Sequence, residues 1–317
     1  MTMTKKIMKM ITVIVLIGFL YPNCSIKKFA MNSVANAMTG EGSSTVFTGD
    51  NDPELVADAL PFAIKLYETL LSSLPKHQGL IVQTGSLYIM YANAFLYVPA
   101  SMLSDEEHLE QEFLMKRAKN LYLRGRDIIL KGLDLKYPGF LSKLKNKKYK
   151  EALATVGNDD LSLLYWGGAG WMGAYAIDPF DMDLGVTLPG AAELMKAVSR
   201  IDSGFMKGAI HEFYISYYGS LPDYMGGDKK KARFHYKKAI EMTEGKSTSP
   251  YVSYASTILV DEQKLKEFRQ VLKKVIDFKL DSAPENMLVN TLNLRKAKWL
   301  LEHVDDLFIE SDVPEKD

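Results

Sequence analysis

The sequence is short of the residue types that build disulfide, metal and nucleic-acid sites. Cys24 is its only cysteine, which excludes an intramolecular disulfide framework and a cysteine-based metal cluster. The five histidines are scattered, and no two of them have the spacing of metal ligands on one helix. Basic and acidic residues both number 39, so the basic excess of a nucleic-acid-binding surface is missing. We therefore expect no nucleic-acid partner and no cofactor.

Long apolar runs are also missing. The N-terminal run, residues 10–20, follows three lysines and is about half as long as the roughly 20 residues of a membrane-spanning helix. This arrangement is typical of a secretory signal, and Cys24 follows where a bacterial lipoprotein signal is cleaved. We predict a signal peptide over residues 1–23 and a lipid anchor on Cys24, on the periplasmic side of a bacterial membrane. Tyr21 and Asn23 depart from the usual lipoprotein cleavage motif, so secretion with an unmodified thiol is the alternative.

The rest of the chain has the composition and periodicity of a large helical domain. Of its 317 residues 47% are apolar, and the alternating β-branched runs that indicate strands are almost absent. Apolar residues recur with the helical period, beginning with Leu55, Phe62 and Leu66. The predicted helices span residues 53–74, 80–97, 104–136, 160–175, 189–201, 204–218, 228–242, 261–280 and 284–304.

Parts of this domain show the small–large–small spacing of tetratricopeptide second helices. The spacing occurs at Ala232, Tyr236 and Ala239. It occurs again at Gly125, Ile129 and Gly132, where the two small residues are glycines in place of alanines. Looser copies are Leu194 with Ala197, and Phe268, Leu272 and Val275. Small residues at these places let paired helices approach closely. We predict an all-α fold, a tetratricopeptide-like array of antiparallel helix pairs over residues 53–304. A flexible tether (24–52) precedes this domain and a C-terminal tail (305–317) follows it.

Motifs of enzymes and metal sites are incomplete in this sequence. His211 and Glu212 begin like a zinc-protease helix, but no second histidine follows four residues later. Asp178, Asp181 and Asp183 gather without the glycine and the final glutamate of a calcium loop. These incomplete motifs favour a protein that is not an enzyme and binds no metal. An envelope enzyme with an unrecognised site is the weaker alternative.

Aromatic residues gather in helices that are also rich in glycine. Four glycines lie between Tyr165 and Tyr175, and an interior helix glycine costs about 0.8–1 kcal/mol relative to alanine. Core packing is one interpretation of this composition, and an apolar passage between helices that binds a small molecule is the sharper hypothesis. The predicted lining residues are Tyr165, Trp166, Trp171, Tyr217, Tyr251 and Trp299, with His211 and Glu212 as polar contacts that orient the ligand.

Short segments in order along nearly the whole chain are similar to those of a known family. They are Cys24-Ser25-Ile26-Lys27-Lys28, Asp52-Pro53-Glu54-Leu55-Val56, Ala59-Leu60-Pro61-Phe62-Ala63, Lys65-Leu66-Tyr67-Glu68, Thr84-Gly85-Ser86, Tyr122-Leu123-Arg124, Tyr137-Pro138-Gly139-Phe140, Leu163-Leu164-Tyr165-Trp166, His211-Glu212-Phe213, Met225-Gly226-Gly227, Ser249-Pro250-Tyr251-Val252-Ser253, Trp299-Leu300-Leu301-Glu302 and Asp305-Asp306-Leu307-Phe308. In these segments the chain resembles TatT, the T component of tetratricopeptide-protein-associated TRAP transporters.

The resemblance implies a periplasmic lipoprotein with an all-helical, tetratricopeptide-like fold. It also implies a partner, the solute-binding P component, and a role in uptake through a TRAP permease. A homotrimer and a passage through each protomer for an apolar ligand belong to the same implication. The alternative is a helical-repeat scaffold that organises other envelope proteins and binds no small molecule.

Overall fold

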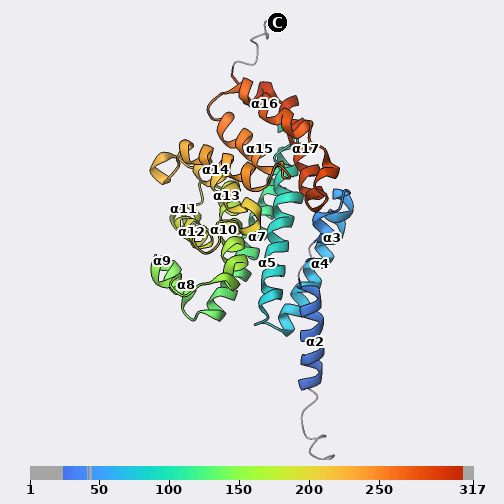
Figure 1. The fold of residues 1–317 in the computed structure, drawn as a ribbon, viewed down its shortest axis with the longest axis vertical. Helices are drawn as coiled ribbons and strands as arrows, with labels where there is room; N and C mark the ends of the chain where they lie inside the picture. Colours follow the sequence, from blue (N-terminus) through green and yellow to red (C-terminus); the bar gives the residue numbers. More distant parts are fainter. Residues whose placement is uncertain (1–23, 41, 43–44, 310–317) are drawn as a thin grey trace, which may run out of the picture.

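Helices supply all the regular secondary structure of the residues that the computed structural model describes, which are 24–40, 42 and 45–309 (Figure 1). The all-α prediction is therefore confirmed. The predicted signal peptide, residues 1–23, lies outside the described residues. Among the helices that are described, none combines the length and the apolar character needed to cross a membrane.

Each of the nine predicted segments contains a helix. The long helices are α4 (Pro53–Ser73), α5 (Gln78–Ala92), α7 (His108–Lys136), α10 (Leu161–Ile177), α12 (Pro189–Ile201), α13 (Ala209–Ser220), α14 (Lys229–Met242), α16 (Leu265–Ile276) and α17 (Met287–Glu302). The remaining α-helices are α2 (Cys24–Met38), α3 (Thr45–Thr48), α6 (Val98–Ala100), α8 (Phe140–Lys145), α9 (Tyr149–Ala152), α11 (Met182–Thr187), α15 (Ser249–Tyr254) and α18 (Val304–Leu307). Two π-helical segments, Asn93–Tyr97 and Ala255–Leu259, continue α5 and α15.

Local sequence determines where several of these helices begin. The Asp52 carboxylate accepts a hydrogen bond from the Leu55 amide at 3.0 Å, and Pro53 occupies the first position of α4. The Asp228 carboxylate caps α14 in the same way by accepting from the Lys231 amide at 3.0 Å. These caps satisfy backbone N–H groups that have no partner within the helix, so they hold the helix starts at these residues.

Glycines bring α5, α7 and α10 into close contact. A Cβ atom on Gly125 would lie 2.6 Å from the carbonyl oxygen of Gly85, so the backbones of α5 and α7 nearly touch there. A Cβ on Gly132 would lie 2.5 Å from the Ile81 side chain, and one on Gly173 would lie 2.3 Å from the Tyr122 ring. The packing reason expected for the small residues of the repeat pattern is therefore confirmed at Gly125 and Gly132.

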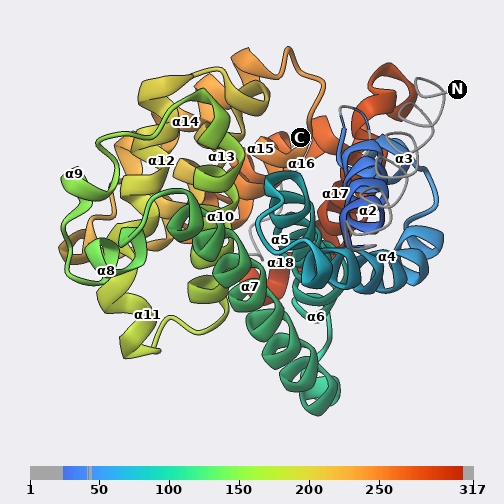
Figure 2. The ribbon, with the colours of Figure 1, turned by 90° about the horizontal axis from the view of Figure 1, so that it is seen from below.

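Seven helices follow one another around the molecule. In the order α4, α5, α7, α10, α13, α15 and α17, each packs against the next, and α17 returns to α4 and to the short helix α3 (Figure 2). Arg295 of α17 forms an ion pair with Glu54 of α4. The Lys296 ammonium donates to the Ser101 carbonyl, just beyond α6, at 3.2 Å. The array of helix pairs is thus closed by contacts between its C-terminal and N-terminal helices. We call these seven helices the ring.

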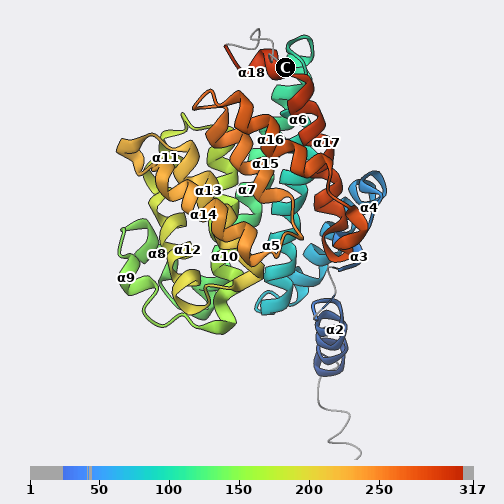
Figure 3. The ribbon, with the colours of Figure 1, turned by 45° about the horizontal axis from the view of Figure 1, so that its top comes forward.

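The segment predicted as a flexible tether contains two helices. Figure 3 shows α2 extending from one end of the molecule, with α3 beside α17. The end of α2 packs on the domain: Ala35 is fully buried, the Tyr67 hydroxyl donates to the Met38 carbonyl at 2.8 Å, and His77 Nε2 lies 2.9 Å from Asn36 Oδ1. The prediction did not include the helix α2, because the segment begins with a basic, only mildly apolar stretch and ends in polar and glycine residues.

One further boundary, the start of the C-terminal tail, differs from the prediction. The beginning of the predicted tail belongs to the domain, because Phe308 is 4% exposed and packs edge-on against Phe268 at 4.9 Å. In α4, Leu55 and Phe62 are 58% and 74% exposed, whereas the buried face includes Leu60. The helix is apolar on two faces, and periodicity alone did not identify the face that packs.

Candidate functional site

The contact between α10 and α13 brings together three of the predicted ligand-binding residues. Tyr165 and Trp166 meet edge to face at 5.2 Å between ring centroids, and Phe205 lies 5.8 Å from Tyr165. Burial raises the pKa of Tyr165, and the nearby charge of Glu212 raises it further. Tyr165, Trp166 and Glu212 therefore form one aromatic and acidic cluster on the ring.

Glu212 is the acidic member of this cluster and is only partly accessible. Burial raises its pKa to about 7, against the effect of the Ser249 hydroxyl, which favours the charged form. Near neutral pH this carboxyl exists in both protonation states, so it both donates and accepts hydrogen bonds. Such a group suits recognition of a polar atom in a site that is otherwise aromatic.

Polar side chains of α17 continue the site beyond Glu212. The Asn293 amide donates to the Ser249 hydroxyl at 2.9 Å, and the fully buried Asn290 accepts from the Thr248 amide at 2.9 Å. Asn290 also donates to the Lys246 carbonyl at 3.1 Å. These bonds fix the start of α15 against α17 and hold Ser249 beside Glu212.

Lys296 is a half-buried cation one helical turn beyond Asn293. Its ammonium donates to Ser101 Oγ at 2.9 Å and lies 4.3 Å from the centroid of the Trp299 ring. Burial lowers the pKa of Lys296 to about 8. No carboxylate of the described residues lies within ion-pair distance of it, so the Trp299 ring and Ser101 provide its stabilisation.

A third polar group lies between α5 and α7. The Tyr122 hydroxyl donates to Asn93 Oδ1 at 2.9 Å. Burial raises the pKa of Tyr122, with a further contribution from Tyr97. Asn93 and Tyr97 belong to the π-helical segment after α5, which rotates their side chains relative to a regular helix.

The other predicted lining residues lie in separate environments. Trp171 is 7% exposed and packs beneath the guanidinium of Arg126, 5.2 Å from its ring centroid. Tyr217 is 8% exposed and stacks on Phe213 at 5.8 Å. Tyr251 lies among α14, α15 and α16, 6.0 Å from the Tyr236 ring. These three aromatic residues pack between helices and do not join the cluster around Glu212.

His211 belongs to a histidine pair between α13 and α14. Its Nδ1 atom lies 2.8 Å from Nδ1 of His235, so the N–H of one ring donates a hydrogen bond to the bare nitrogen of the other. His235 also lies against Tyr214 and Tyr218, with centroid distances of 4.7 and 5.7 Å. Burial lowers the pKa of both histidines, to about 4 for His235. His211 thus faces α14, while its neighbour Glu212 lies near Tyr165.

Metal ligation and lipid attachment are the two remaining kinds of site considered for these residues. Within the part of the chain that the structure describes, no group of three or more histidine, cysteine, aspartate or glutamate side chains is arranged to hold a metal ion. Cys24 is the first residue of α2, and its side chain lies outside what the structure describes. The lipid anchor therefore stays a prediction.

Several residues of the site were not identified from the sequence. Asn286, Asn290 and Asn293 recur at intervals of four and three, which places a polar stripe on one face of α17 that begins at the residue just before the helix. That stripe was a usable signal for buried hydrogen bonding. No comparable signal marked Lys296 or Asn93, because their roles depend on the distant partners Ser101 and Tyr122.

The fold and the site together define a helical-repeat protein whose helices surround aromatic and ionisable side chains. Residues 49–308 match the family described as the TRAP transporter T-component, so the chain belongs to that family. The chain is also similar to an uncharacterized protein of Treponema pallidum (strain Nichols), with 30% identity over 302 residues that cover 90% of this chain and 94% of that protein. The predicted resemblance is confirmed, and membership supports an accessory role in TRAP transport.

Proposed function

We propose that this protein is a lipid-anchored, periplasmic T component that binds the solute-binding P component of a TRAP system and relays an apolar or amphipathic ligand. The family match over residues 49–308 is the observation that carries the proposal. Cys24 provides the anchor in this proposal, and the protein does no covalent chemistry. Its contribution to uptake is to keep the solute-binding protein near the membrane and to pass on the ligand.

The ring of helices supports the relay step. Tyr165, Trp166 and Glu212 are each partly accessible, although burial shifts the pKa of both Tyr165 and Glu212. Partial access combined with a strongly desolvated environment is what a narrow passage between helices requires. The aromatic rings would contact the apolar body of a ligand, and Glu212 would meet a polar atom at one end.

The outer face of α4 supports assembly into the proposed homotrimer. Leu55 and Phe62 expose more than half of their surface there, and Leu66 is 38% exposed on the same side of the helix. Exposed apolar side chains at helical spacing are typical of surfaces that bind another protein. Burial of this face between protomers would remove them from water.

Recovery of partners from a bacterial envelope extract tests the proposal. The unlipidated protein is used as bait, and mass spectrometry identifies bound proteins and lipophilic molecules. Recovery of a TRAP solute-binding protein supports the transport role, and a co-purified apolar molecule identifies the ligand class. Recovery of cell-wall or assembly factors alone, without a small molecule, would contradict it.

Substitutions at the cluster test the relay separately. We expect Trp166→Ala to weaken binding of the recovered ligand, because the ring loses its contact with the apolar body. Tyr217→Ala is the comparison, since Tyr217 was also predicted as a lining residue but packs against Phe213, outside the cluster. The relay through the cluster fails if Trp166→Ala stays folded and keeps the affinity of the unmodified protein.

A helical scaffold without a small-molecule ligand is the second candidate function. The packing of Trp171, Tyr217 and Tyr251 between helices favours it, because these rings serve the fold where they lie. An extract that yields other envelope proteins, with no bound lipophile, would support the scaffold over the relay.

A further inference from the structure

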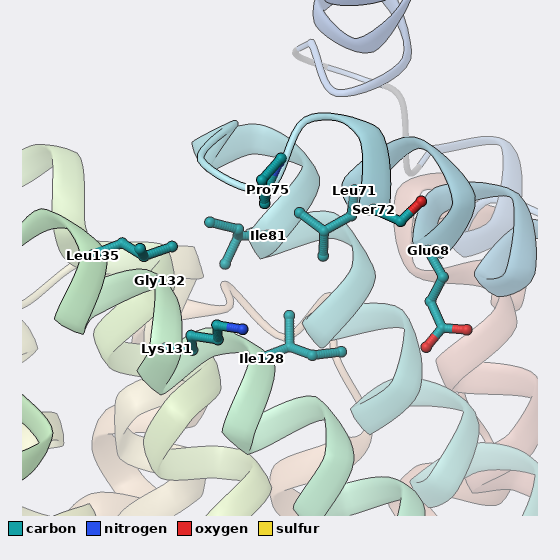
Figure 4. Close-up of a pocket in the computed structure, with 9 residues that line it drawn as sticks. All are labelled: Glu68, Leu71, Ser72, Pro75, Ile81, Ile128, Lys131, Gly132 and Leu135. Carbon is teal, nitrogen blue, oxygen red and sulfur yellow. The ribbon is translucent and has the colours of Figure 1, made fainter.

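A cleft outside the ring cluster lies across α5, between α4 and α7. Its volume is about 420 Å³, within the range of small-molecule sites. Figure 4 shows the side chains that surround it. They are Glu68, Leu71, Ser72 and Pro75 at the end of α4 and just after it, Ile81 of α5, and Ile128, Lys131, Gly132 and Leu135 of α7. None of these residues belongs to the predicted site.

Two small residues shape the cleft. Gly132 lets α7 sit directly on α5, because a Cβ there would lie only 2.5 Å from the Ile81 side chain. Ser72 contributes only a hydroxyl on the α4 side. The floor is formed by Ile81, which is 2% exposed, and the walls are mostly aliphatic. The depression therefore suits an aliphatic group rather than a flat aromatic stack.

Two charged side chains, Glu68 and Lys131, lie on opposite sides of the cleft, and only Glu68 has ion-pair partners among the described residues. Glu68 is already neutralised by Lys65 and Arg124, each in ion-pair contact with its carboxylate. Lys131 has no carboxylate within ion-pair distance among the described residues. Figure 4 shows the Lys131 nitrogen between Ile81 and Ile128, across the cleft from Glu68. The charged group of the cleft that is available to pair with a ligand is thus the positive ammonium of Lys131.

We propose that this cleft binds a monoanionic amphiphile, an aliphatic carboxylate whose chain lies on Ile81 and whose carboxylate pairs with Lys131. An aliphatic chain matches the isoleucine and leucine walls, and the ammonium matches a single carboxylate. The two ion pairs of Glu68 keep that carboxylate from repelling the ligand. This site is separate from the aromatic cluster and does not depend on the relay proposed above.

Titration of the purified protein with decanoate tests the cleft, with decanol as the uncharged ligand of equal chain length. Ser72→Phe places a ring in the cleft and should abolish saturable decanoate binding. Ser73→Phe is the matched control, because Ser73 is exposed on the same helix and does not line the cleft. Circular dichroism checks that each variant is folded.

The charge contact is tested by Lys131→Met, which keeps the length of the side chain. We expect decanoate affinity to fall about three- to tenfold, as for a partly exposed ion pair, and decanol binding to stay unchanged. Lys116→Met, at an exposed position of the same helix, should change neither.

The proposal is overturned if decanoate does not bind, or if folded Ser72→Phe binds it as well as the unmodified protein does. Loss of decanoate binding in Trp166→Ala but not in Ser72→Phe would place the ligand in the ring cluster instead.

Discussion

At the scale of single residues, the buried ionisable groups link stability to pH in opposite directions. Glu212 has a pKa raised to about 7, so the folded state binds its proton more tightly than the unfolded state does. Its protonated form therefore favours folding below the unfolded pKa near 4.5, and this contribution is lost as pH rises through about 7.

Glu212→Gln should remove this dependence. The amide is neutral at every pH, so at pH 8 the variant should be more stable than the unmodified protein by about 1–3 kcal/mol. Chemical denaturation at pH 5 and pH 8 measures the difference. The exposed Glu112→Gln on α7 is the control and should leave the pH profile unchanged. Equal stability of Glu212→Gln and the unmodified protein at pH 8 would show that the carboxyl is well solvated.

The pair of His211 and His235 makes the folded state less stable as the pH falls, the opposite of the effect of Glu212. Burial, the neighbouring His211 and Lys231 lower the pKa of His235 to about 4, so the unfolded state binds protons that the folded state does not. Stability should therefore decline as pH falls from about 6.5 towards 4, by up to about 3 kcal/mol. His235→Phe keeps a ring between Tyr214 and Tyr218 and should flatten this decline. Denaturation between pH 4 and pH 7 in a Glu212→Gln background isolates the effect, and an unchanged slope in His235→Phe would refute the assignment.

At the scale of elements, the sequence predicted best those helices whose ends are marked by capping residues or prolines in the chain itself. Residues 189–201 match α12 in full, and the caps Asp52 and Asp228 mark the starts of α4 and α14, because the chain itself supplies the hydrogen-bonding partner. Short or irregular elements such as α8, α9 and α15 were missed. Their stability depends on packing against distant segments, for example the bond from Thr248 to Asn290.

The candidate site was predictable only in part for a related reason. Composition marked aromatic helices, but the side to which each ring points depends on neighbours far away in sequence. Tyr165 and Tyr251 carry the same kind of side chain, and only Tyr165 lies beside Glu212. Periodicity likewise identified α4 as a helix through Leu55 and Phe62, but it did not show that the helix buries a different face.

The glycine contact of α5 and α7 gives a prediction at this scale. Gly125→Ala should gain about 1 kcal/mol of helix propensity but place Cβ 2.6 Å from the Gly85 carbonyl oxygen. The backbone must shift to relieve this overlap, so we expect a net loss of about 1–2 kcal/mol. Gly185→Ala in α11 is the control, since its nearest neighbours lie at 3.8 Å, and it should be neutral or stabilising. Urea unfolding measures both, and a stabilised Gly125→Ala would show that the two helices separate easily.

At the scale of the whole molecule, closure of the ring depends on α17. Helices at the two ends of a repeat array normally lie far apart, because each unit contacts only its neighbours. Here α17 packs on α3 and α4, and its polar side chains reach both Ser101 and Thr248. An ion pair between residues 241 positions apart, Arg295 and Glu54, lies at this junction. The junction is thus the place where segments far apart in the sequence close the ring.

A charge exchange at this junction tests the closure. Arg295→Glu places two carboxylates together, so amide hydrogen exchange in α17 and the first turns of α4 should become a few-fold faster. Adding Glu54→Arg restores an ion pair of opposite polarity and should return exchange to the original rate. Arg269→Glu changes charge by the same amount at an exposed site of α16 and should leave the junction unaffected. If the double variant exchanges as fast as Arg295→Glu alone, apolar packing and not the ion pair holds the junction. If Arg269→Glu has the same effect, net charge is the cause.

Ligand release should quicken together with exchange in Arg295→Glu if the ring must open for the ligand to pass.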